Sequence, residues 1–270
     1  TDGRLRRGKT TLFSVRGEYH APTRAVAAAL WAQKLPLSAV PFLPARLAHL
    51  KGTMNFEGMV VGSTGMPVLS GRFQTSLLSR DKRPVEASGR IWLAGQTLVL
   101  DRFTADGASI RFRGALALSE PRVFRASLAT DRARLDTLEA LLGVGGDDPP
   151  AGRLTGRADL AGTLANPSGS GRFRADGVAW RALRAETGHL RFSLAGQRLW
   201  IQGLDLQQPA GRFHLSLETR FDRRIGPLQV RAWMDRFELG GRRWTGECRL
   251  DGRGAPDAAD VLAADLTVSG

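Results

Sequence analysis

A nine-residue pattern recurs along this chain at intervals of about a hundred residues. It reads Leu-x-Gly-x-x-x-apolar-x-Gly at 50–58, and the same spacing returns at 154–162. A third copy, with tryptophan in place of the leucine, occupies 244–252. An internal repeat constrains the fold strongly, because every copy must form the same local structure and bury its apolar residues against neighbouring copies.

Further landmarks follow the first two copies in the same order. Ser-Gly-Arg-Phe stands at 70–73 and 170–173, Leu-Ala-Gly-Gln at 93–96 and 194–197, and Asp-Arg at 131–132 and 235–236. We therefore divide the chain into the end of a preceding unit at 1–49, one unit at 50–153, a second at 154–243 and the start of a third at 244–270. Both ends cut through patterned sequence, so we expect a segment of a longer protein.

Within each unit apolar residues alternate with polar ones, which is the period of half-buried β-strands. The 32 glycines and 13 prolines supply frequent turns, among them those expected at 95–96, 106–107 and 209–211. The sequence predicts a mainly β fold of repeated antiparallel strands, with Arg111 and His214 on the polar face. The residues expected on the apolar face are Leu98, Leu100, Ile110, Phe112, Leu116, Leu118, Leu199, Ile201, Leu204, Leu206, Phe213, Leu215 and Leu217.

Helix is expected in few places. Leucines at 135, 138, 141 and 142 lie on one side of a short amphipathic helix that we place at 131–142, ended by Gly143. Residues 35–50 form a less regular equivalent of it. The segment 143–152, with Asp-Asp-Pro-Pro at 147–150, has the composition of a linker.

The net charge of +13 raises the question of a nucleic-acid partner. The basic residues are dispersed, however, and only four of the 39 are lysine, so we expect no nucleic-acid partner. The charge is compatible with attraction to anionic lipid headgroups. Aromatic residues make up 7% of the chain, which argues against a sticky aromatic surface. The single cysteine, Cys248, excludes an intramolecular disulfide, and no apolar run reaches the length needed to span a bilayer.

The stretch Gly-Arg-Ala-Asp-Leu-Ala-Gly-Thr-Leu-Ala-Asn-Pro-Ser-Gly-Ser-Gly-Arg-Phe at 156–173 resembles the recurring strand pairs of the AsmA-like superfamily, which includes the TamB-like and YhdP-like envelope proteins of Gram-negative bacteria. The Asp-Arg-x-x-Leu-Asp-x-Leu segment at 131–138 is also similar to short helices of that family. The resemblance covers most of residues 50–252.

This resemblance implies an elongated, U-shaped β-groove in a periplasmic protein that is anchored to the inner membrane through segments outside this chain. The groove would carry phospholipid acyl chains between the inner and outer membranes or support outer-membrane assembly and protein export. An outer-membrane barrel protein is one partner that it implies. No cofactor and no metal are expected. The alternative is a closed β-solenoid that fills its own core and binds no ligand.

Several patterns suggest chemistry, but we assign no catalytic site to them. Residues 3–10 match the phosphate-binding pattern Gly-x4-Gly-Lys-Thr, yet the alternation at 11–17 predicts a strand where a P-loop needs a helix. The four histidines, at 20, 49, 189 and 214, lack metal-ligand spacing. No Gly-x-Ser-x-Gly elbow occurs, and Pro167 prevents glycosylation of Asn166.

Four functions therefore compete. The lipid-carrying or assembly scaffold comes first and the ligand-free solenoid second. A nucleic-acid-binding module rests on charge alone. A transmembrane barrel is disfavoured, because its aromatic girdles need more than one tyrosine and six tryptophans.

Overall fold

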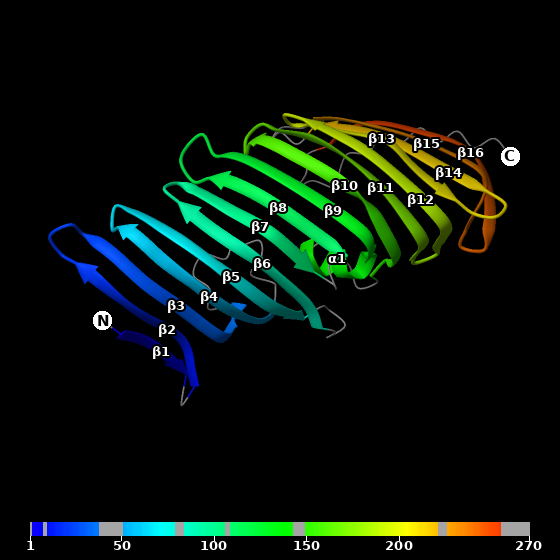
Figure 1. Cartoon of the computed structure of the whole chain (residues 1–270). Helices are drawn as coiled ribbons and strands as arrows, with labels where there is room; N and C mark the ends of the chain where they lie inside the picture. The colour runs from blue at the N-terminus through cyan, green and yellow to red at the C-terminus, as the bar shows by residue number, and fades with distance from the viewer. Residues whose placement is uncertain are drawn as a thin grey trace. The chain divides into compact units, whose positions relative to one another are not determined.

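The computed structural model describes residues 2–7, 10–37, 51–78, 84–105, 109–142, 149–220 and 226–254 (Figure 1). The chain divides into two compact units, described separately below. Unit 1 comprises residues 1–128 and 137–145, and unit 2 comprises 129–136 and 146–270. In both units the strands are antiparallel and follow one another in sequence order, so the predicted mainly β fold of repeated antiparallel strands is confirmed.

Unit 1 is a meander in which each strand pairs with the next along the chain. Its turns fall where glycine or proline allows the chain to reverse, as at Gly95 with φ 56°. Its strands are β1 (Asp2–Arg7), β2 (Thr10–His20), β3 (Ala25–Pro36), β4 (Lys51–Ser63), β5 (Met66–Leu78), β6 (Pro84–Ala94), β7 (Thr97–Ala105) and β8 (Ile110–Ala117).

Unit 2 repeats this arrangement with longer strands, and its β12 also contacts β15 through the pair Leu183 and Leu239. The turn predicted at 209–211 is present between its strands β13 and β14. Its strands are β10 (Ala151–Thr163), β11 (Pro167–Trp180), β12 (Leu183–Ala195), β13 (Arg198–Gln207), β14 (Arg212–Arg220), β15 (Gly226–Leu239) and β16 (Arg242–Gly254).

The helix predicted at 131–142 is shorter than expected. Residues 131–134 continue strand β9 (Val123–Arg134), and α1 spans only Leu135–Leu142. The reason is a bulge at Arg132, which adopts φ 52° and donates its backbone N–H to Thr155 Oγ1 at 3.0 Å. The predicted linker likewise ends early, because Ala151 and Gly152 already belong to β10.

The same bulge recurs at other basic residues within strands. Lys34 and Arg236 also have positive φ, and their N–H groups donate to Asn55 Oδ1 at 2.8 Å and to Thr245 Oγ1 at 3.0 Å. Each bulge adds one residue to its strand, so that residues three positions apart across it, such as Ala32 and Leu35 or Met234 and Phe237, lie on the same face. The repeat is thus visible in backbone conformation as well as in sequence.

Some expectations concern residues outside the described ranges. The helical segment predicted at 35–50 falls largely there, as do the turn at 106–107 and the acidic pair at 147–148. The predicted boundary at 153/154 lies inside β10 and that at 243/244 inside β16. The U-shape implied by the family resemblance stays a prediction.

Candidate functional site

The strand register of unit 1 places one set of apolar side chains on a single face. Leu98 lies opposite Leu116, Phe103 opposite Phe112, and Ala105 opposite Ile110. Leu100 is on the same face, because it alternates with outward-facing Asp101 and Val99. We call the side that carries these residues the apolar face and the opposite side the polar face. Arg111, opposite Thr104, lies on the polar face, as predicted.

Aromatic rings extend this face across five strands of unit 1. Phe56 lies opposite Phe73 on neighbouring strands, and the ring centroids of Phe73 and Phe103 are 6.3 Å apart. Phe103 meets Phe112 edge to face at 6.4 Å. Offset and edge-to-face ring pairs are the favourable geometries. The apolar face therefore runs without a break from β4 to β8.

Unit 2 carries an equivalent face. One row joins Leu190, Leu204 and Leu215 across β12, β13 and β14, and the next joins Phe192, Ile201 and Leu217. The remaining predicted residues of this unit follow the same register, with Leu199 opposite Leu194 and Leu206 opposite Phe213. His214, opposite Asp205, lies on the polar face.

The apolar face is only partly covered. Of the 13 residues predicted for it, Ile110 is 2% exposed and Leu206 is 7% exposed, and ten others are half-buried. Leu118 follows the end of β8 and is 45% exposed. In a closed protein core such side chains would be almost fully buried. Over most of its described extent the face is therefore accessible to a ligand.

One end of unit 2 is closed. Where β12 meets β15, Phe237 is 1% exposed and packs with Ala185 and Leu206. Leu204 and Phe213, both predicted groove residues, pack against this cluster. We call it the closed end. Leu204, Leu206 and Phe213 thus lie in or against a dry core, whereas Ile201 and Leu217 lie further along the same strands.

Gln208 holds the closed end together through its side chain. Its Nε2 donates to the carbonyl oxygens of Arg184 on β12 and Glu238 on β15, the latter at 2.9 Å, and its Oε1 accepts the Glu238 N–H at 2.7 Å. The amide thereby satisfies backbone groups of two strands that are not sequence neighbours. The sequence offered no signal for this, since a lone glutamine beside a Pro-Ala-Gly turn has the appearance of a solvated loop residue.

Replacing Gln208 by alanine is expected to lower the free energy of unfolding by about 1–3 kcal/mol, because three hydrogen bonds that join β12 and β15 are lost. Urea unfolding followed by circular dichroism would measure this. Gln197, in the exposed turn between β12 and β13, is the matched control, and its alanine variant should change the stability by less than about 0.5 kcal/mol. Equal effects of both substitutions would contradict the assigned role of Gln208.

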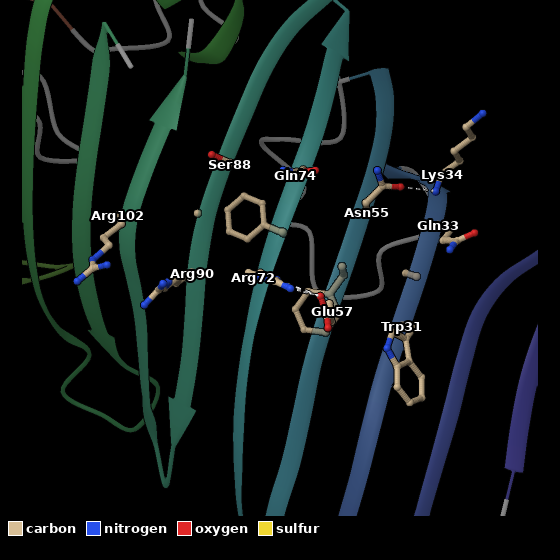
Figure 2. A pocket seen from close by; sticks show the side chains of 14 residues that line it. Trp31, Gln33, Lys34, Asn55, Glu57, Arg72, Gln74, Ser88, Arg90 and Arg102 are labelled. Atoms are coloured by element: carbon tan, nitrogen blue, oxygen red, sulfur yellow. Dashed lines mark hydrogen bonds and ion pairs between the residues drawn. The ribbon is translucent and has the colours of Figure 1, made fainter. Parts of the chain in front are cut away.

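A pocket with a volume of about 900 Å³ lies on the polar face of unit 1 (Figure 2). Trp31, Asn55 and Arg72 are among the side chains around it, and Arg72 bonds Glu57 with N–O distances of 3.0 and 2.7 Å. This pocket could not be predicted from the sequence, because its lining residues come together only through the register between neighbouring strands. Its lining combines amide, guanidinium and carboxylate groups with apolar side chains, among them Trp31 and Phe73.

Phenylalanine and tryptophan are divided between the two faces. The phenylalanines described above are on the apolar face, whereas Trp31, Trp92, Trp200 and Trp233 lie opposite polar-face residues. Trp92 is 55% exposed. These four tryptophans are divided between the two units and no two of them form a ring pair in the described part of the chain, so the expectation that no sticky aromatic surface forms stays a prediction.

The chemistry-bearing residues form no recognisable catalytic group in the described part of the chain. His214 Nδ1 lies 2.6 Å from Asp205 Oδ1, and its ring stacks on Trp233. A hydrolytic triad needs a nucleophile at the other ring nitrogen, and no hydroxyl or thiol among the described residues bonds it. After the phosphate-binding pattern at 3–10, the chain continues as strand β2, as predicted.

Neither a metal-binding cluster nor a helix that could cross a membrane is present in the described residues. No cluster of three histidine, cysteine, aspartate or glutamate side chains is arranged to hold a metal ion there. The one α-helix in those ranges, eight residues long, is too short to cross a bilayer. Cys248 lies on the apolar face, opposite Ala232, and is half-buried. No family model, curated protein or solved structure matches the chain.

Proposed function

We propose that this chain is part of a non-catalytic envelope protein whose apolar face holds phospholipid acyl chains. In the full protein this face would carry phospholipid between the inner and outer membranes, or support outer-membrane assembly and export. The observation that carries the proposal is the apolar face itself, which runs across successive strands in each unit and stays half-buried. The resemblance to the AsmA-like superfamily, with its periplasmic setting, supports the same reading.

The energetics suit an acyl chain. Removing a methylene group from water yields about 0.8 kcal/mol, so a chain lying along several strands could be held without any reacting group. The half-buried leucine, isoleucine and phenylalanine side chains would complete their burial against it. Such a ligand needs no fixed polar partner along its length, which fits a face without charged residues at its predicted positions.

A ligand-free structural scaffold is the second candidate, and the closed end of unit 2 favours it. There the sheet packs on itself without a ligand, as Phe237 and its neighbours show. The two candidates differ at Ile201 and Leu217, which remain half-buried. A scaffold needs no occupant at these positions, whereas a lipid-holding face does.

The single cysteine provides the test. Cys248 faces the apolar side, so alkylation of its thiol by N-ethylmaleimide should slow in proportion to occupancy when palmitoyl lysophosphatidylcholine is added. Glycerophosphocholine, which has the same headgroup without the chain, should have no effect. A variant with Gln202→Cys and Cys248→Ser moves the thiol to the polar face. Its alkylation rate should be the same with and without the chain-bearing lipid. Alkylation of Cys248 at one rate with and without the chain-bearing lipid would refute the proposal.

A further inference from the structure

Three arginines lie side by side on the polar face of unit 2. Arg172 on β11 is directly opposite Arg157 on β10 and directly opposite Arg191 on β12. All three side chains are exposed. Because neighbouring strands lie about 4.8 Å apart, the three residues form a continuous row of positive charge. We call this row the arginine ladder.

The ladder is not neutralised within the described part of the chain. None of its three arginines makes an ion pair or a side-chain hydrogen bond there. Directly opposed like charges destabilise a sheet, so the row lowers the stability of the free protein. A partner that supplies negative charge would remove this cost.

The corresponding row in unit 1 is built differently. There Arg72 is opposite Glu57 and bonds it at 2.7 Å, and Arg113 bonds Asp101 at 3.0 Å. Arg90 is opposite Asp101 in the register. Arg72 and Arg90 are also directly opposite each other, so unit 1 contains one like-charged pair, with a carboxylate on each side of it. The row in unit 2 differs because it consists of Arg157, Arg172 and Arg191 without a carboxylate.

We propose that the arginine ladder docks this face of unit 2 on the phosphate groups of an anionic phospholipid bilayer. The three arginines are exposed and line none of the four best-defined pockets, so their charges are presented at the surface of the sheet, where an array of headgroups can reach them. The adjacent row on the same face contains Asp159, Ser170 and Ser193, followed on β13 by Trp200. A single-stranded nucleic acid is held by aromatic rings interleaved with the cations, and no ring stands between these arginines.

This docking is separate from the holding of acyl chains, since it uses the opposite face of the same strands. An arginine near an anionic membrane surface adds to the binding free energy through its attraction to lipid phosphates, and this attraction falls off within a Debye length. Binding through the ladder should therefore require anionic lipid and weaken with salt. Holding of acyl chains should depend on neither.

The test is co-sedimentation of the full chain with vesicles of phosphatidylcholine, alone or mixed with phosphatidylglycerol. The variant Arg157→Gln/Arg172→Gln/Arg191→Gln should lose about tenfold or more in partitioning onto the anionic vesicles. The control Arg72→Gln/Arg113→Gln/Arg122→Gln removes the same three charges from ion-paired positions and should bind as the unmodified chain does. Ile201→Asp, which alters only the apolar face, should also bind normally.

Thermal unfolding checks that the ladder variant folds. Its midpoint should equal or exceed that of the unmodified chain, because the substitutions remove like-charge repulsion. Equal losses for the ladder variant and the control would mean that net charge alone drives binding, and would overturn the proposal. The proposal would also be overturned if the chain bound neutral vesicles as well as anionic ones. The same holds if an oligonucleotide displaced the unmodified chain from anionic vesicles and the ladder variant no longer bound that oligonucleotide.

Discussion

Replacing Phe237 by alanine is expected to lower the free energy of unfolding by about 3–5 kcal/mol. Phe237 is 1% exposed, its ring lies 5.7 Å from that of Phe213, and it packs with Ala185 and Leu206 at the closed end. Removing the ring would leave a cavity where β12 and β15 meet. Most of the apolar face is half-buried, so this end supplies much of the core-like packing in unit 2.

Urea unfolding monitored by circular dichroism would measure the loss. The matched control is Leu239→Ala, two residues further along β15 and 41% exposed, which should cost less than about 1 kcal/mol. If the Phe237 variant were as stable as the Leu239 variant, the closed end would not be the core of unit 2.

Placing a carboxylate on the apolar face is expected to abolish binding of acyl chains. In Ile201→Asp the charge would lie between Phe192 and Leu217, and burying it under a ligand would cost several kcal/mol, enough to weaken binding by about a hundredfold or more. Titration with a fluorescent fatty acid would give the dissociation constants. The neighbouring substitution Gln202→Asp adds the same charge to the exposed polar face and should leave binding unchanged.

This pair of variants separates the effect of the face that carries the charge from the effect of net charge, because each variant has one additional negative charge on the same strand. Comparable weakening by both would assign the effect to charge. Undiminished binding by the Ile201 variant would exclude this part of the apolar face as the place where the chain lies.

The repeat and the alternation were sufficient to predict antiparallel strands, but strict alternation does not give the face of apolar residues on the two sides of a bulge. The irregular spacing from Leu100 to Phe103 is a case in point, because a simple period of two would put them on opposite faces. The register shifts between them, at the bulge that includes Arg102, and returns Phe103 to the apolar face. Ile201 and Leu204 show the same shift.

Features that depend on contacts between distant strands could not be predicted in this way. The helix start was misplaced because the bulge at Arg132 relies on Thr155, which lies on a different strand. The closed end relies on β12 meeting β15, and the arginine ladder on register across β10, β11 and β12. In sequence, these three arginines are dispersed like the others.

Site-specific photo-crosslinking in cells, followed by lipid mass spectrometry, would show directly whether the apolar face holds phospholipid. Photoreactive residues at Leu100, Phe112, Ile201 and Leu217 would probe the accessible apolar face, Leu206 the closed end, and Arg111 and Gln202 the polar face. We expect phospholipid adducts through the acyl chain at the first four positions and none at Leu206, Arg111 or Gln202. Absence of adducts at all four apolar positions, in a folded protein in its full-length context, would contradict the proposed function and favour the ligand-free scaffold.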